Sequence, residues 1–342
     1  MIEGRFRMVM PMAKSRFLVV AAAALLTTAR IADAQEFSLT TGTSTGVILG
    51  IARELVLSGS YVVSELDWPL LPAVFVGTAV NLTTPVGFIA SLEVQAAVPT
   101  PTGTMTDSDF LNGDGVKTHY SQSDSILSGA LVATVQAGWS FPLPDQEFTL
   151  APFLQFEYMQ FKWTAENGYL QYPPTGQSSP NYTPWFPGET KVPIYGTGII
   201  YTQTYLIPAV GIKGSIQALE SLTVNFSLAI SPYMWCFDLD EHLFRFLRFY
   251  DNLRGGIMIE PSLSAALKIT PRATVTLEAR YRHISGLVGD TVEVGTGATG
   301  YTPPPTPPDP GPGQSVSFPT AAGASLDAVS ISLMLKYVLL GP

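Results

Sequence analysis

Charged residues are scarce in this sequence of 342 residues. Lys, Arg, Asp and Glu together make up 13% of it, about half the share found in a typical soluble domain. Hydrophobic residues reach 46%, yet beyond residue 34 the chain has no run of about eighteen apolar residues, which a spanning helix would need. The composition therefore disfavours both an ordinary soluble domain and a helical membrane protein. It favours a transmembrane β-barrel, in which only every second residue faces lipid.

Cysteine and histidine are also rare. The single cysteine, Cys236, cannot form an internal disulfide, and the three histidines are His119, His242 and His283. Gly-x-Ser-x-Gly, His-Glu-x-x-His and paired-cysteine motifs are missing, so the common signatures of serine hydrolases and zinc sites are not present. We expect neither a metal ion nor another cofactor.

The first 34 residues have the plan of a secretory signal peptide. Basic residues precede an apolar run at 17–26, and Ala32-Asp33-Ala34 supplies a small-x-small cleavage site. We therefore expect residues 1–34 to be removed and residues 35–342 to form a single domain. Removal takes away five of the 18 basic and two of the 27 acidic residues, which leaves 13 and 25 and a net charge of −12. Such a charge argues against a nucleic-acid partner and favours cationic ones.

Apolar and polar residues alternate with a period of two in several parts of the mature chain. This pattern predicts strands with one apolar face and one polar face. In a barrel, the apolar face would contact lipid and the polar face would line the lumen. The clearest segments are 88–96, 222–230, 274–282 and 329–339.

Short turns and long polar segments alternate between these strands. The turns are expected near 82–85, 142–145, 219–221 and 270–272, and the long segments near 104–120, 165–195, 237–255 and 287–322. This asymmetry is typical of outer-membrane barrels, which have short periplasmic turns and long extracellular loops. With one more loop near 58–60, it predicts an all-β fold, a ten-stranded antiparallel transmembrane β-barrel with both termini on the short-turn side.

One acidic cluster with a histidine follows a predicted strand. Asp238, Asp240 and His242 are spaced by two residues, so an extended chain points all three to the same face. A carboxylate beside an imidazole orients it and stabilises its protonated form, which makes the histidine a competent general base. Counting from Leu222, however, the even positions face lipid. We therefore expect a β-bulge before Asp238, near Pro232, that returns the cluster to the lumen.

A pair of aspartates, Asp107 and Asp109, follows an earlier strand. If the parity of Ser91, Glu93 and Gln95 continues, both aspartates lie on the lumen side. Two close carboxylates raise each other's proton affinity, and such a pair can hold a water molecule and share a proton. On the residues alone, both clusters would fit solvated or calcium-like acidic loops equally well.

Several motifs resemble the omptin family of outer-membrane endopeptidases, and they follow one another in order over most of the chain. In chain order they are Gly50-x-x-x-Glu54-x-Val56, Ser64-x-Leu66-Asp67-Trp68, Asp107-x-Asp109, Tyr201-x-Gln203-x-x-x-x-Pro208 and the cluster from Asp238 to His242.

The resemblance implies a peptidase site at the extracellular rim of a barrel in the cell outer membrane. Asp240 with His242 matches one couple of the family, and Asp107 with Asp109 matches the couple that faces it across a cleft. A water molecule between the two couples would be activated by His242 and Asp107 to attack the scissile carbonyl, without an acyl-enzyme intermediate.

The resemblance also implies a specificity pocket. Glu54 and Asp238 match the acidic floor of the pocket that takes a basic side chain before the cleaved bond. Carboxylates in such a pocket would favour Arg or Lys through charge-assisted hydrogen bonds. The implied substrates are therefore peptides or proteins with basic residues.

Two positions depart from the family pattern. A further acidic residue of the family is His119 here, which leaves the preference after the scissile bond open. Omptins also bind lipopolysaccharide through basic residues, and residues 203–205 lack the expected arginine. Outer-membrane lipid remains an expected partner, with a requirement for lipopolysaccharide left open. Ser121 lies where omptins carry a serine near the site, and we expect it to orient a neighbour.

Two other functions compete with the endopeptidase. A catalytically inactive omptin-like barrel would act as a surface adhesin or interaction protein, but such a relative would be free to lose Asp107, Asp109, Asp240 and His242, and all four are present. A passive pore is disfavoured because ten strands enclose too narrow a lumen for an open channel. The endopeptidase is therefore the preferred interpretation.

Overall fold

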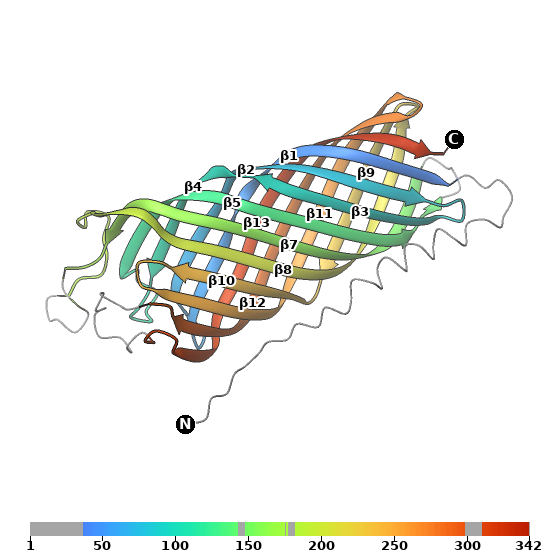
Figure 1. Ribbon diagram of the computed structural model, residues 1–342. Helices are drawn as coiled ribbons and strands as arrows, with labels where there is room; N and C mark the ends of the chain where they lie inside the picture. Colours follow the sequence, from blue (N-terminus) through green and yellow to red (C-terminus); the bar gives the residue numbers. More distant parts are fainter. Residues whose placement is uncertain (1–36, 143–147, 175, 177–181, 298–309, 342) are drawn as a thin grey trace.

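The computed structural model describes residues 37–142, 148–174, 176, 182–297 and 310–341 (Figure 1). The predicted signal peptide lies outside the described residues. The described residues form thirteen strand segments of one antiparallel sheet. Their bounds are β1 (Ser38–Ser58), β2 (Tyr61–Thr83), β3 (Phe88–Val98), β4 (Thr100–Asp109), β5 (His119–Trp139), β6 (Phe141–Pro142), β7 (Phe148–Gln171), β8 (Val192–Leu219), β9 (Leu222–Ser231), β10 (Met234–His242), β11 (Leu247–Thr270), β12 (Ala273–Gly295) and β13 (Ser315–Leu340).

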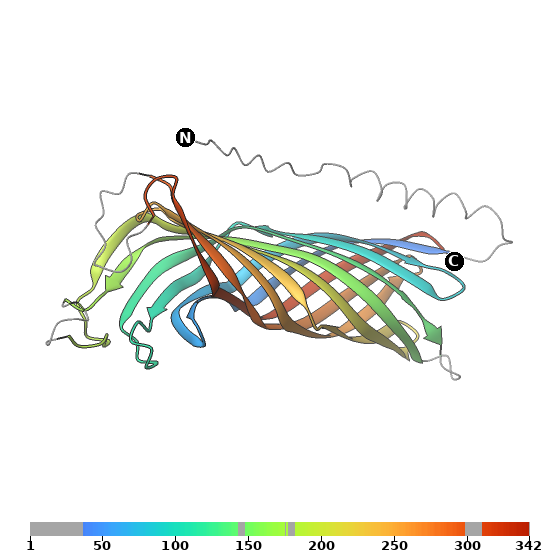
Figure 2. The ribbon, with the colours of Figure 1, turned by 90° about the horizontal axis from the view of Figure 1, so that it is seen from below.

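The sheet closes into a barrel of long, tilted strands (Figure 2). β1 pairs with both β13 and β2, and the pairing of β7 with β8 joins the two ends of the sheet. The sequence predicted ten strands, whereas the described residues form thirteen strand segments. β3 and β4 share the partners β2 and β5, β9 and β10 share β8 and β11, and β6 follows β5 along β7. Two of these breaks fall at Pro99 and Pro232, which have no backbone N–H to donate to a neighbour.

The short turns and the long loops lie at opposite ends of the barrel, as predicted (Figure 1). The turns at 84–87, 220–221 and 271–272 lie at one end. β1 starts and β13 finishes at this end too, where Leu39 pairs with Leu340. The predicted turn near 142–145 falls mainly on residues outside the described part.

The loops are shorter than predicted, because the strands continue into the polar segments. β7 and β8 stay paired as far as Leu170 and Val192, inside the segment 165–195 that the sequence predicted to be a loop. Asn167 and Gly168 suggested a loop, but they form bulges within the strand, with φ angles of 57° and 115°. The strands therefore extend past the apolar segments, and their polar parts form the loop end of the barrel.

The bulge predicted near Pro232 is confirmed. Leu228 and Ile230 of β9 are exposed on the outside, whereas Met234 and Cys236 of β10 are buried in the lumen. The even positions thus change face at the break. Against β8 the register shifts by one residue, which is the expected signature of an inserted residue.

The outer surface divides into an apolar belt near the turn end and a more polar surface near the loop end. On β13, Val329, Ile331, Leu333 and Leu335 all point outward with exposed fractions from 39% to 53%. Farther along the wall toward the loops, Arg53 forms outward ion pairs with charged neighbours on β2 and β13. No helix among the described residues is long and apolar enough to cross a membrane.

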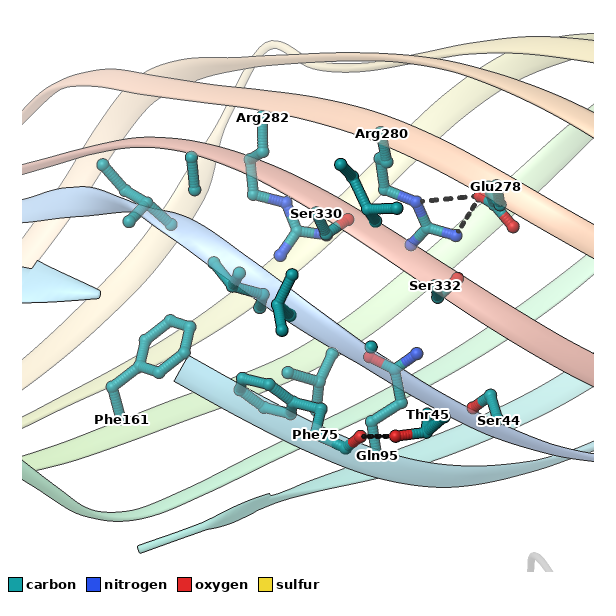
Figure 3. Close-up of a pocket in the computed structure, with 17 residues that line it drawn as sticks. Ser44, Thr45, Phe75, Gln95, Phe161, Glu278, Arg280, Arg282, Ser330 and Ser332 are labelled. Carbon is teal, nitrogen blue, oxygen red and sulfur yellow. Dashed lines mark hydrogen bonds and ion pairs between the residues drawn. The ribbon is translucent and has the colours of Figure 1, made fainter. Parts of the chain in front are cut away.

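Inside the belt, the lumen contains a group of paired charges that we call the waist network: Glu157, Glu260, Glu278, Arg280 and Arg282. Arg282 is an ion-pair partner of both Glu157 and Glu260. Arg280 donates to Glu278 at 2.8 Å, and Figure 3 shows these two side chains together, with Arg282 on the same strand. Each carboxylate of the waist network is therefore paired with an arginine.

Candidate active site

β10 carries the acidic cluster along the lumen face near the loop end. Asp238 and Asp240 are buried, and His242 is partly exposed, as a reactive group at a cleft must be. Asp240 Oδ2 lies 2.5 Å from His242 Nε2, and the ring of Phe249 packs edge-on against the imidazole. The carboxylate thus fixes the orientation of the ring and leaves Nδ1 for another partner.

β4 carries the aspartate pair on the lumen side, as predicted. Asp107 accepts hydrogen bonds from Ser64 Oγ of β2 at 3.0 Å and from Ser121 Oγ of β5 at 3.5 Å. Burial raises the pKa of Asp107, while the Ser64 bond and the nearby His242 act to lower it. The two couples therefore lie close enough across the cleft to influence each other's charge. Ser121 orients Asp107, as expected.

Asp109 is held in a form that keeps its proton at neutral pH. Burial, and next the charge of Asp107, raise the pKa of Asp109 to about 8. Arg245, in the loop between β10 and β11, is near enough to oppose this shift. A pair of this kind carries one shared proton near neutrality and can both accept and return it.

Glu54 and Asp238 meet in the lumen although they come from β1 and β10. Glu54 accepts from Trp68 Nε1 at 3.3 Å, and Asp238 accepts from the Tyr201 hydroxyl at 2.9 Å. The rings of Trp68 and Tyr201 stack with 5.0 Å between their centroids, so the two donors form one aromatic floor. Burial raises the pKa of both carboxyls, and each is raised further by neighbouring carboxylates.

The floor is anchored from the opposite wall of the barrel. Gln203 Nε2 of β8 donates across the lumen to the Arg53 carbonyl of β1 at 3.2 Å. Trp163 of β7 donates to the Pro69 carbonyl of β2 at 3.1 Å. These bonds hold the walls together below the carboxylates, and the floor separates the site from the waist network.

One acidic residue of the site was missed by the sequence reasoning. Asp251 of β11 lies directly opposite Asp238 in the antiparallel register and is buried on the same lumen face. It belongs to the segment 237–255, which the sequence predicted to be a loop, and a loop has no regular alternation of faces from which the direction of its side chain could be predicted. Together with the five predicted carboxylates it forms what we call the rim site: Glu54, Asp107, Asp109, Asp238, Asp240 and Asp251.

The rim site lies beyond the apolar belt. Several residues that alternate with it are polar or charged: Arg53 precedes Glu54, Ser108 separates Asp107 from Asp109, and Glu241 separates Asp240 from His242. Leu239, between Asp238 and Asp240, is apolar. Arg248 pairs with Glu241 at 2.7 Å on this outer face. The outer face around the site therefore carries more charge than the apolar belt.

His119 stands at the edge of the cleft. It pairs in register with Asp109 and its ring packs edge-on against Tyr172, with 4.8 Å between centroids. Burial lowers the pKa of His119, so it is neutral at neutral pH. It does not supply the negative charge that the omptin pattern carries at this position.

The rim site can bind a cation and activate a water molecule. Its carboxylates lie close enough to act on one another's charge, and His242 acts on Asp107 in the same way. Among the described residues, no group of three or more His, Cys, Asp or Glu side chains is arranged to hold a metal ion. Proton transfer between carboxylates, imidazole and water is thus the chemistry that these side chains can supply themselves.

The fold is thus a closed antiparallel barrel with a cluster of acids and a histidine at one end of its lumen. The sequence pattern of the Omptin family matches residues 35–302, so the chain belongs to the Omptin family.

The chain is also similar to individual members of this group. It is 24% identical to outer membrane protease OmpP of Escherichia coli (strain K12) over 284 residues, covering 80% of this chain and 87% of that protein. The crystal structure of outer membrane protease OmpT from Escherichia coli matches with a TM-score of 0.75 and 19% identity, covering 90% of this chain and 99% of that one. The second likeness shows a shared fold.

Proposed function

We propose that the protein is an outer-membrane endopeptidase that hydrolyses peptide bonds next to basic residues. The observation that carries this proposal is the Asp240–His242 couple, with a contact of 2.5 Å, facing Asp107 and Asp109 at the mouth of an Omptin-family barrel. The family relatives named as outer-membrane proteases support the same activity and location.

Hydrolysis begins with a water molecule between His242 and Asp107. His242 accepts a proton from this water as the water oxygen bonds to the scissile carbonyl carbon, and Asp240 stabilises the resulting imidazolium. His242 then returns the proton to the leaving nitrogen as the C–N bond breaks. The proton held by the Asp107–Asp109 pair stabilises the developing oxyanion, because a protonated carboxyl donates a hydrogen bond. No acyl-enzyme forms along this route.

Substrate choice comes from the pocket below these groups. A guanidinium or ammonium group before the scissile bond would contact Glu54 and Asp238 and favour their ionised forms. Trp68 and Tyr201, which already donate to these carboxylates, hold them in place for the incoming cation.

The barrel spans the outer membrane with its apolar belt, and the loop end faces the extracellular side. Lipid would contact the outward residues of the belt, such as Ile331 and Leu333. Lipopolysaccharide is one candidate lipid, although the segment 203–205 carries no arginine for it. The site would then meet peptides outside the cell.

A peptide assay tests the proposal. Refolded protein should cleave a fluorogenic peptide after its single Arg, with and without added lipopolysaccharide, and His242→Ala should lower turnover by about 10²–10⁴-fold. Asp114→Asn is the matched control, because Asp114 is an exposed acid in the loop between β4 and β5. Wild-type protein that leaves the peptide intact in both lipid conditions would support the inactive adhesin instead.

A further inference from the structure

The position of Asp251 lowers the stability of the fold unless a ligand binds there. It pairs directly with Asp238 between β11 and β10, and its charge makes ionisation of Asp238 less favourable. Both side chains are more than nine-tenths buried, with exposed fractions of 8% for Asp251 and 4% for Asp238. An apolar or hydroxyl residue at this position would avoid the repulsion.

One oxygen of Asp251 is free to accept a ligand. Oδ1 of Asp251 is buried and has no hydrogen-bond partner among the described residues. A buried carboxylate oxygen without a donor is a costly arrangement, and it indicates a group that binds there transiently. The adjacent wall is formed by Thr291 of β12, which lies opposite Asp251.

The titratable groups that share this space are also acidic. Asp251 acts on the charges of both Glu54 and Asp238, and Asp240 acts on Asp251. The pKa of Asp251 is raised to about 6, by burial first, so this carboxyl is still mainly ionised at neutral pH. Asp238, with a pKa of about 8, is mainly protonated when the pocket is empty.

We propose that Asp251 is a third carboxylate of the cation pocket and that it selects a guanidinium over an ammonium group. The carboxyls of Glu54, Asp238 and Asp251 come from β1, β10 and β11 and lie close enough to act on one another's charge. A guanidinium presents five N–H donors in a rigid plane and can pair with carboxylates on several edges, whereas an ammonium is a compact charge with three donors. This inference rests on the proposed function for the identity of the ligand, a basic side chain of a substrate.

Two small molecules test it without hydrolysis. Agmatine carries a guanidinium and an ammonium, and cadaverine carries two ammonium groups, so the pair differs in the group at issue. Calorimetry on the refolded full chain should find agmatine bound more tightly than cadaverine. Asp251→Asn should weaken agmatine by about tenfold or more and cadaverine by less than about threefold, because one charge-assisted bond is lost only to the guanidinium.

Two further variants keep the result interpretable. Asp251→Glu retains the carboxylate and should keep agmatine bound more tightly than cadaverine. Asp290→Asn removes a carboxylate from the outer face of β12, where Asp290 accepts from the Thr320 backbone, and should leave both affinities unchanged. Unchanged far-UV circular dichroism shows that each variant has folded.

The inference is overturned if Asp251→Asn leaves both affinities within about twofold of wild type, or lowers both by the same factor. The experiment can distinguish failure of this inference from failure of the proposed function. Agmatine binding that depends on Asp251 in a protein that cleaves no peptide would sustain the pocket and end the endopeptidase. If Asp251→Asn still cleaves after Arg and binds agmatine as tightly as wild type, the endopeptidase would be sustained and the role of Asp251 in the pocket would be ruled out.

Discussion

The waist network and the rim site both contain carboxylates in the lumen of one barrel, but these carboxylates have different partners. In the waist network, Glu157 and Glu260 share Arg282, and Glu278 is bound by Arg280. In the rim site, Glu54 and Asp238 receive hydrogen bonds from neutral donors, an indole and a phenol. Buried charges that are paired hold a fold together, whereas acids crowded without matching cations lower its stability.

We infer that the waist network stabilises the fold and that the rim site serves the proposed function, at different heights along the barrel axis. The waist network lies in the lumen at the level of the apolar belt, and its loss should affect folding. The rim site lies beyond the belt, and in the proposed function a basic substrate would supply the missing positive charge there. We therefore expect substitutions in the two regions to change different measurable properties, and the following predictions test that division.

The largest effect is expected for the catalytic couple. Asp240→Asn should lower turnover by about 10²–10⁴-fold, because the imidazolium of His242 loses the carboxylate that stabilises it. Peptide affinity and the unfolding transition should stay close to wild type, since Asp240 has an unpartnered buried oxygen and contributes little to the fold. Steady-state cleavage of an Arg peptide measures the change. Turnover within a few-fold of wild type would move water activation to another group.

The waist network should show the opposite behaviour. Arg282→Met leaves Glu157 and Glu260 without their shared cation, so the free energy of unfolding should fall by about 3–5 kcal/mol. Turnover per folded molecule should change little. Urea unfolding in detergent measures the loss, and Arg248→Met is the control, because its exposed pair with Glu241 should contribute less than about 1 kcal/mol. Equal losses in both variants would contradict the assignment.

The acids of the pocket should make cation binding depend on pH. Asp238 has a pKa of about 8 in the empty pocket, raised mainly by burial, so it holds a proton below that pH. A bound cation favours the ionised form and expels this proton. Agmatine affinity should therefore increase as pH rises from 6.5 to 8, by at most about tenfold per pH unit for one proton, and then level off.

Asp238→Asn tests the source of that dependence. This variant cannot release the proton, so its affinity should vary much less over the same pH range. Calorimetry in two buffers of different ionisation enthalpy should detect proton release in wild type and less of it in the variant. A flat affinity profile in wild-type protein would show that Asp238 is already ionised before the cation binds.

Much of the fold could be predicted because the alternation of apolar and polar residues along a strand is visible in the local sequence. Alternation at 222–230 and 329–339 fixed the outward faces, and the parity conflict before Asp238 located the bulge at Pro232 correctly. The ends of the strands could not be predicted in the same way. Asn167 and Gly168 are typical of loops, but pairing with a neighbouring strand holds them inside β7.

The rim site was predictable only in part for a similar reason. The spacing of Asp238, Asp240 and His242 is visible in the chain, as is that of Asp107 and Asp109. Asp251 enters the site through the register between β10 and β11, and register depends on how two distant segments pair. Which charges are paired and which are not could not be predicted either, because the pairing depends on which strands face each other in the closed barrel.

The central claim is that the acids of the rim site are kept for substrate at the expense of stability, and one variant tests it most directly. Asp238→Asn relieves the repulsion with Glu54 and Asp251 while keeping an acceptor for Tyr201. At pH 8, we predict that urea unfolding of this variant requires about 1 kcal/mol more free energy than wild type, while its preference for Arg over Ala peptides collapses. A variant that is less stable than wild type and still prefers Arg would contradict the account.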